Sequence, residues 1–142
     1  KIRSPEISRL TSRLSALKPV RDTLLVSQRR MGSAGGVVLE GRDIGTVVFP
    51  DAELKFYLFA SAEERGRRRF EELTEKGEKV TLKDTIAEVI RRDIQDSERD
   101  IAPLCQAEDA VAIDSSSMSV ENVLDMMEDI FRVRMQLGGS AL

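Results

Sequence analysis

Three short apolar runs alternate with longer segments of helical periodicity, and this alternation constrains the fold more than any other feature of the chain. The runs lie at residues 37–39, at 54–59, where Lys55 interrupts the apolar side chains, and at 110–113. Strands that alternate with helices are typical of an α/β fold with a mostly parallel sheet, and 142 residues suit one such domain. Ligands of such sheets bind at the carboxyl ends of the strands, so we expect the functional residues to follow these runs.

The segments between the runs carry helix-start signals. Capping patterns predict helices that begin next to Ser61, Thr81 and Ser119. Two earlier helices are expected before the first run, one that starts at Pro5 and one that follows an interruption at Pro19. The sequence therefore predicts five helices and three strands.

Composition excludes several classes of chemistry. The chain has no histidine and one cysteine, Cys105, so zinc sites, Ser-His-Asp triads and Cys-His pairs are excluded. A single cysteine also excludes an internal disulfide and favours a reducing compartment, so we expect a cytoplasmic protein. No apolar run approaches the ~20 residues that span a bilayer, and we therefore expect no membrane partner.

The basic amino-terminal segment raises the question of a nucleic-acid partner. Residues 1–31 hold eight basic and two acidic side chains, but no aromatic residue on which a base could stack. A solvated helical face explains this segment better than a polynucleotide site, so we expect no nucleic-acid partner. Mixed charge with many arginines suits a small anionic ligand better than a long polyanion.

The segment that follows the first apolar run, Glu40-Gly41-Arg42-Asp43, combines three charged side chains. Arg42 offers the planar fork that suits a phosphate, and Asp43 can accept hydrogen bonds from an amino group or a ring N–H. Glu40 could hold a water of a hydrated Mg²⁺. The same charges are compatible with a salt bridge that only anchors the next loop, and the residues alone do not decide between these interpretations.

Two later segments are rich in arginine. The segment 65–69 places two or three guanidinium groups on one helical face, and the segment 91–99 carries Arg92, Asp96 and Arg99 at i, i+4 and i+7. Each is compatible with a solvated helix that forms intrahelical ion pairs. Together, the two helices could form a flap that closes on phosphates and stabilises the charge of a transferring phosphoryl group.

The residues Gly41–Ala52 (GRDIGTVVFPDA) resemble the signature of bacterial cytidylate (CMP) kinases. The resemblance continues in later segments, which are 60–65, 67–69, 91–93 with Asp96 and Arg99, 101–104 and 113–115. It covers about residues 2–135. Enzymes of this family use ATP with Mg²⁺ to phosphorylate CMP or dCMP, so the resemblance implies these substrates and this metal. We expect the enzyme to act as a monomer.

The resemblance also implies roles in binding the acceptor nucleotide. Ser12, Arg21 and Asp43 resemble the side chains that recognise cytosine. Arg92 and Asp96 resemble the pair that binds the sugar hydroxyls. A carboxylate can accept from the exocyclic amine of cytosine while an arginine donates to the ring carbonyl, so the chemistry of these residues fits the implied roles.

The catalytic set implied by the resemblance consists of arginines. Arg42 and Arg99 resemble the guanidinium groups that hold the phosphate of CMP, and Arg68 resembles a lid arginine that meets the transferring phosphate. Glu40 falls where the family has an acidic residue near the metal, which it would contact through water. No general base is needed, because phosphoryl transfer depends mostly on positioning and charge stabilisation.

One part of the family pattern is not found. The family begins with a strand and a phosphate-binding loop of the form G-x-x-x-x-G-K-[ST], and the 142 residues contain no such sequence. In the family's sheet that strand lies between those that match 37–39 and 54–59. We therefore expect the C-terminal portion of a longer enzyme, inactive alone, with a partial three-layer P-loop nucleoside monophosphate kinase fold that lacks the phosphate-loop strand.

The expected organisation is one truncated domain with four parts. They are part of the CMP-binding insert with the following helix (1–31), core strands with the signature (32–64), an Arg-rich lid (65–100), and a final core strand and helix (101–142). Two alternatives stay open: a non-catalytic interaction domain derived from a kinase, and a related nucleotide kinase with a different acceptor. The missing loop favours the first, whereas Arg21 with Asp43 favours cytosine over other acceptors.

Overall fold

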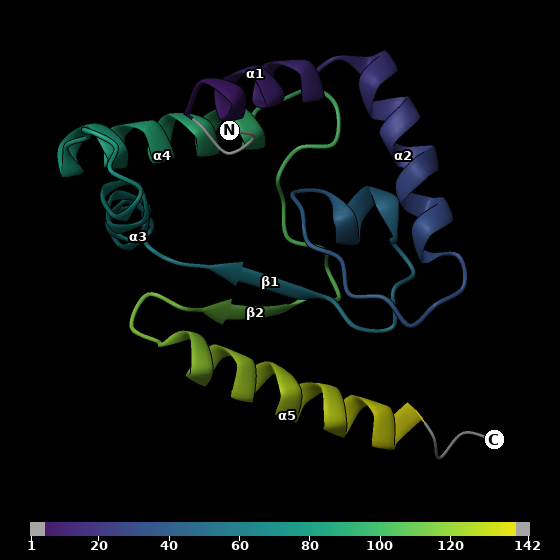
Figure 1. Ribbon diagram of the computed structural model, residues 1–142. Coiled ribbons are helices and arrows are strands. Elements are labelled where there is room, and N and C mark those ends of the chain that lie inside the picture. Colours follow the sequence, from purple (N-terminus) through teal and green to yellow (C-terminus); the bar gives the residue numbers. More distant parts are fainter. Residues whose placement is uncertain (1–4, 139–142) are drawn as a thin grey trace. The chain divides into compact units, whose positions relative to one another are not determined.

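The computed structural model describes residues 5–138 (Figure 1). The chain divides into two compact units. The first unit contains the residues up to Asp51 together with Asp96–Cys105, and the second contains Ala52–Gln95 and the residues from Gln106 onward. None of the helices in the described range is both long enough and apolar enough to cross a bilayer.

The first unit is helical. It contains α1 (Pro5–Ser15), α2 (Lys18–Gly32) and the short π-helix η1 (Ile44–Val48). Both expected helices are confirmed, and the proline at position 19 lies in the first turn of α2, where a missing N–H costs no hydrogen bond. Ser4, which the sequence predicts as the N-cap of the first helix, lies outside the described residues.

The strand expected at 37–39 is wrong. Val38 is 99% exposed and Val37 is 48% exposed, and the segment has no regular structure. A strand exists through hydrogen bonds to a neighbouring strand, and within residues 5–138 no segment pairs with this one. An apolar run can therefore indicate that a segment favours a sheet. The run becomes a strand only where a second strand pairs with it.

The turn η1 was not expected. The amide of Val48 donates to the carbonyl of Asp43 at 3.1 Å, and the amide of Phe49 donates to that of Ile44 at 2.7 Å. These bonds close i→i+5 rings, which define a single π-helical turn. The turn begins directly after Asp43, so it fixes the backbone that carries the Arg42–Asp43 pair.

The second unit contains a two-stranded parallel sheet and three helices. Strands β1 (Phe56–Phe59) and β2 (Val111–Asp114) pair with Phe56 opposite Val111. Helices α3 (Ala62–Glu75) and α4 (Leu82–Ser97) lie between the two strands in the sequence, and α5 (Val120–Gly138) follows β2. The last residues of α4 belong to the first unit. The α/β class with a parallel sheet is thereby confirmed.

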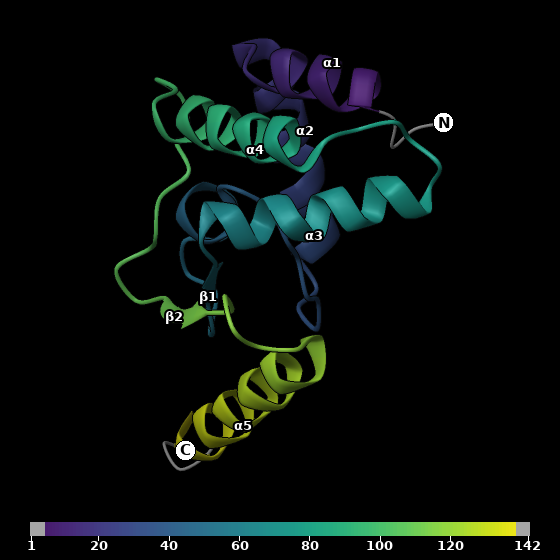
Figure 2. The same ribbon diagram turned by 90° about the vertical axis from the view of Figure 1, so that its left-hand side faces the viewer.

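The expected helix starts are confirmed by their hydrogen bonds. Ser61, Thr81 and Ser119 each accept from the amide three residues later, at 3.1 Å in every case. Helices α3 and α4 pack together (Figure 2) at Gly66, where an added Cβ would lie 2.4 Å from a side-chain carbon of Ile86. Only a glycine permits this approach of the two helices.

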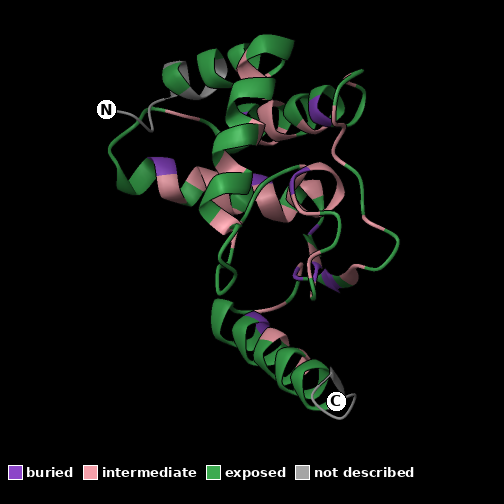
Figure 3. Ribbon diagram, turned by 90° about the vertical axis from the view of Figure 1, so that its right-hand side faces the viewer, coloured by how far each residue is buried: buried purple, intermediate pink, exposed green. Residues whose placement is uncertain are grey.

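Helix α5 is exposed over most of its length (Figure 3). A cavity of about 370 Å³ lies between this helix and the beginnings of β1 and β2. The buried ammonium of Lys55 lies beside it and donates to both carboxylate oxygens of Asp109 at 2.8 Å. The cavity is at the amino ends of the strands, so it is not where a parallel sheet presents its ligand site.

Candidate functional site

Five charged side chains meet in the first unit, and we refer to Arg21, Arg42, Asp43, Asp96 and Arg99 as the charged cluster. Arg21 donates to the carboxylate of Asp43. Nε of Arg42 donates to Oδ2 of Asp96 at 2.9 Å. Arg99 lies between the two carboxylates, with nitrogens 3.8 Å from Asp96 and 4.0 Å from Asp43. Residues from three separate parts of the sequence thus form one ionic network.

Local structure explains how Arg21, Asp96 and Arg99 are placed. Arg21 lies in the first turn of α2 and also donates to the carbonyl of Ser15 at 3.1 Å, at the end of α1. Asp96 is in the last turn of α4, where its carbonyl accepts from the amide of Leu104 at 2.7 Å. Arg99 follows the helix, and its Nε donates to the carbonyl of Ala102. The loop after α4 is therefore folded back on the cluster by backbone and side-chain bonds.

The cluster is largely withdrawn from water. Side chains of Arg21, Asp43, Asp96 and Arg99 are between 9% and 16% exposed, whereas that of Arg42 is 44% exposed. Burial lowers the pKa of the Arg99 guanidinium, as does Arg21, while the two aspartates raise it. The environment of Arg99 thus disfavours its positive charge more than the nearby carboxylates favour it.

Among residues 5–138, the charged cluster has more positive than negative side chains, and it has a hydrogen-bond donor without an acceptor. Within the described part of the chain, three arginines face two aspartates, so the cluster carries an excess of one positive charge. Nη2 of Arg99 is buried and has no hydrogen-bond partner among the described residues. A buried donor without a partner costs roughly 1–3 kcal/mol, and more when it is charged. A bound anion would supply both the missing charge and the missing acceptor.

The roles expected for Ser12, Arg92 and Glu40 are not tested by these contacts. Ser12 lies in α1, but its side chain is outside the described residues. Arg92 is exposed on α4 in the second unit. Glu40, which precedes Arg42 in the sequence, is exposed as well. Their predicted roles stay predictions. Among residues 5–138 there is no group of three or more histidine, cysteine or acidic side chains that could hold a metal ion.

Arg68 is held by partners of the second unit. Its Nε donates to Oε1 of Glu64 at 2.7 Å, and its two terminal nitrogens donate to the hydroxyl and the carbonyl of Ser115. Ser115 directly follows β2, so Arg68 ties α3 to the carboxyl end of that strand. Hydrogen bonds from Arg67 and Arg68 lower the pKa of Glu64. To contact a transferring phosphate, Arg68 would have to give up its hydrogen bonds to Glu64 and Ser115.

Arg29, which contacts the turn η1 directly after Asp43, could not be predicted from the sequence. Arg29 of α2 donates from Nε to the carbonyl of Val48 at 3.1 Å and from Nη2 to that of Val47 at 2.8 Å. These carbonyls belong to η1, which directly follows Asp43. No residue pattern relates an arginine to backbone carbonyls eighteen residues later, so no sequence signal was available for this contact.

Comparison with known proteins gives one consistent result. The chain matches the family model described as cytidylate kinase over residues 1–133. It is 62% identical over 138 residues to a cytidylate kinase of Citrifermentans bemidjiense, covering 97% of this chain and 59% of that protein. It is 64% identical over 133 residues to one of Geobacter sulfurreducens, covering 94% of this chain and 57% of that protein.

A third relative has a different organisation. A bifunctional pantoate ligase/cytidylate kinase of Synechococcus sp. is 47% identical over 134 residues, which are 94% of this chain and 27% of that protein. The first relatives are themselves longer than the region they share with this chain. The chain spans about three-fifths of their length.

Proposed function

Because this chain belongs to the cytidylate kinase family, we propose that the protein of which it is part transfers a phosphoryl group from ATP to CMP or dCMP. The chain supplies recognition of the acceptor nucleotide and the Arg-rich lid. In this proposal the complete protein has the three-layer P-loop nucleoside monophosphate kinase fold and acts as a cytoplasmic monomer.

The observation that carries the proposal is the excess positive charge of the cluster. A nucleoside monophosphate presents a phosphate that is close to dianionic at neutral pH and has several acceptor oxygens. Among the described residues, Nη2 of Arg99 is a buried donor without a hydrogen-bond partner, and Arg42 is the most exposed arginine of the cluster. These two guanidinium groups are the donors that would hold the acceptor phosphate, which neutralises the cluster.

Recognition of the base rests on the pair Arg21 and Asp43. Cytosine presents an exocyclic amine, which donates to a carboxylate, whereas uracil has a carbonyl at that position. The Asp43 carboxylate would face this amine, and a second N–H of Arg21 would donate to the ring carbonyl. Uracil would place two acceptors opposite each other, so the arrangement favours CMP and dCMP over UMP.

The transfer step needs charge stabilisation more than covalent chemistry by the protein. Arg68 would contribute to it after leaving Glu64 and Ser115, which makes the closed lid and the present contacts alternative states of one side chain. Mg²⁺, which Glu40 would hold through a water, would supply positive charge that offsets the charge of the phosphates. It is usually held through few carboxylates plus waters and phosphates, and the single exposed carboxylate of Glu40 fits such a donor set.

The proposal is tested by the substrate profile of the complete protein. With ATP and Mg²⁺, we expect conversion of CMP and dCMP to their diphosphates and far less conversion of UMP and AMP. Exchange of Asp43 for asparagine should reduce the preference for CMP over UMP. Binding of CMP without turnover would instead support an interaction domain, and equal turnover of CMP and UMP would support a kinase with a different acceptor.

A further inference from the structure

Helix α2 lies along the segment 43–49 with one continuous face. Its half-buried residues between position 21 and its carboxyl end are Arg21, Leu25, Gln28 and Gly32, at i, i+4, i+7 and i+11, and the remaining side chains are exposed. At one end of this face Arg21 binds Asp43. At the other end the helix approaches Phe49 so closely that a Cβ at Gly32 would lie 2.4 Å from its ring. The helix thus contacts both ends of the segment.

Arg29 adds the contact in the middle. It binds the carbonyls of Val47 and Val48, and the amides of the same two residues donate to the carbonyl of Asp43 at 2.9 and 3.1 Å. The backbone of residues 47 and 48 is therefore held from two sides, by a guanidinium fork and by Asp43. A planar fork that engages two successive carbonyls fixes an orientation as well as a position.

We infer that Arg29 is a positioning residue of the acceptor site. It fixes η1 and, through the amides of Val47 and Val48, the backbone of Asp43, so that the Asp43 carboxylate stays between Arg21 and Arg99. It touches no substrate itself. Its effect on CMP rests on the function proposed above, whereas its effect on the segment 43–49 does not.

The neighbouring residue Arg30 offers a matched control. It lies in the same last turn of α2 and carries the same charge, so the loss of either residue removes the same favourable interaction with the helix dipole. In the complete protein, Arg29→Ala should raise KM for CMP about tenfold, as expected for the loss of one or two hydrogen bonds, and leave KM for ATP unchanged. Arg30→Ala should change neither. Arg29→Lys should recover part of the loss, because an ammonium reaches the carbonyls without the fork.

Two further readouts separate positioning from general destabilisation. In an Asp43→Ala background, Arg29→Ala should cause no further rise in KM for CMP, because both changes act through one carboxylate. Amide exchange of Val47, Val48 and Phe49 should accelerate in Arg29→Ala and not in Arg30→Ala, at unchanged exchange of α3. Additive effects on KM, or equal exchange in the two variants, would overturn the inference. If the parent protein does not phosphorylate CMP, the proposed function fails, and amide exchange alone decides whether Arg29 holds the segment.

Discussion

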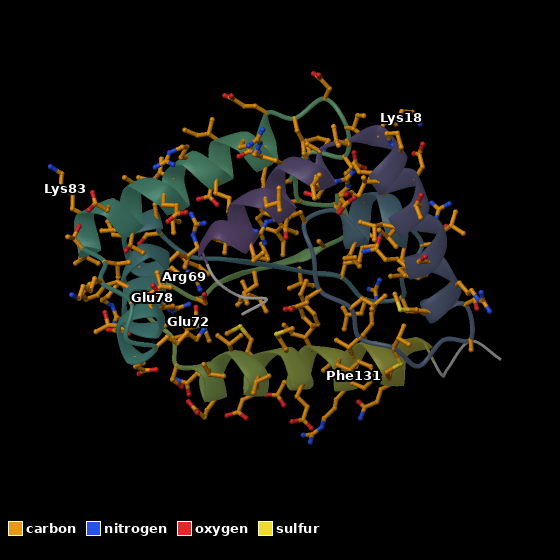
Figure 4. The ribbon with its side chains drawn as sticks, turned by 45° about the horizontal axis from the view of Figure 1, so that its top comes forward. Lys18, Arg69, Glu72, Glu78, Lys83 and Phe131 are labelled. Atoms are coloured by element: carbon orange, nitrogen blue, oxygen red, sulfur yellow. The ribbon has the colours of Figure 1, made fainter. Side chains whose placement is uncertain are left out.

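Two groups of arginines in this chain use the same side chain in opposite ways. On α3, each arginine is paired with a carboxylate of its own unit, since Arg67 binds Glu64 and Glu71, and Arg65 binds Asp93 at 2.6 Å. Arg69 lies beside Glu72 at 2.6 Å (Figure 4). In the charged cluster of the first unit, arginines outnumber carboxylates within the described residues, and one buried guanidinium nitrogen has no hydrogen-bond partner there.

The difference supports the proposal that the arginines of the charged cluster, and not those of α3, bind an anionic ligand. Pairs at the surface, within α3 or between α3 and α4, contribute only about 0–1 kcal/mol each, and they leave no arginine of α3 without a carboxylate. A partly buried cluster with excess charge is unfavourable until an anion completes it. The count of arginines in the segment 65–69 is therefore a weak functional signal, whereas the unequal pairing around Arg99 is a strong one.

The largest effect should come from Arg99. In the complete protein, Arg99→Ala should raise KM for CMP about 100-fold, because a charge-assisted hydrogen bond contributes roughly 1.5–3 kcal/mol and the replacement removes such donors to the phosphate. The matched variant Arg67→Ala, which breaks only exposed pairs on α3, should leave KM for CMP unchanged. Initial-rate kinetics at saturating ATP measure both values. An equal rise in KM for CMP in the two variants would contradict the distinction between the arginines of the charged cluster and those of α3.

Arg68 is one of the paired arginines of α3, and yet we propose that it acts in the transfer step. It therefore tests whether a paired arginine can also have a catalytic role. We expect Arg68→Ala to lower kcat about 30-fold with little change in KM for CMP, somewhat less than the 10²–10³ of a fixed oxyanion donor, because Arg68 must leave Glu64 first. Single-turnover measurements with radiolabelled ATP separate this step from product release. An unchanged rate of the chemical step would place Arg68 with the structural arginines of α3.

Local features of the fold were predictable and nonlocal ones were not. The helix starts at Ser61, Thr81 and Ser119 depend on an amide three residues away, so the sequence carries the whole signal. The apolar run 37–39 needs a partner strand, which no local pattern supplies, and η1 depends on i→i+5 bonds that have no established sequence signature. Local rules therefore describe the helices better than the sheet.

The charged cluster shows a mixed outcome. Charge pattern alone left a ligand site and a strand-end salt bridge equally open at Arg42 and Asp43. The structure contains salt bridges at both residues, so the second interpretation is partly right. What the sequence does not show is that Asp96 and Arg99 join them and leave one charge in excess. Only the family resemblance grouped these residues, and their individual roles stay predictions.

Asp43 is the member of the charged cluster that we propose to recognise the base. Its substitution should therefore change the selectivity for the base and not the binding of the phosphate. We expect Asp43→Asn to raise KM for CMP about tenfold, since one hydrogen-bonded base contact is worth roughly 1–3 kcal/mol of discrimination. KM for ATP should not change, and the CMP-to-UMP preference should fall by a similar factor. Competition assays with both acceptors measure this preference directly. A parallel rise in KM for ATP would assign Asp43 to the general architecture of the site.

The smallest effects concern backbone conformation, and here the two units should respond with opposite signs. Ala102, whose carbonyl binds Arg99, has a positive φ of 49°, and Gly77, at the turn after α3, has a φ of 77°. Ala102→Gly should stabilise the protein by less than about 1 kcal/mol, because relief of strain exceeds the added entropy of the unfolded chain. Gly77→Ala should destabilise it by about 1 kcal/mol, although an added Cβ meets no atom within 4 Å. Urea unfolding of the complete protein measures both. If Ala102→Gly instead destabilises the protein and raises KM for CMP, the stiffness of the Ala102 backbone is part of what holds Arg99 in the cluster.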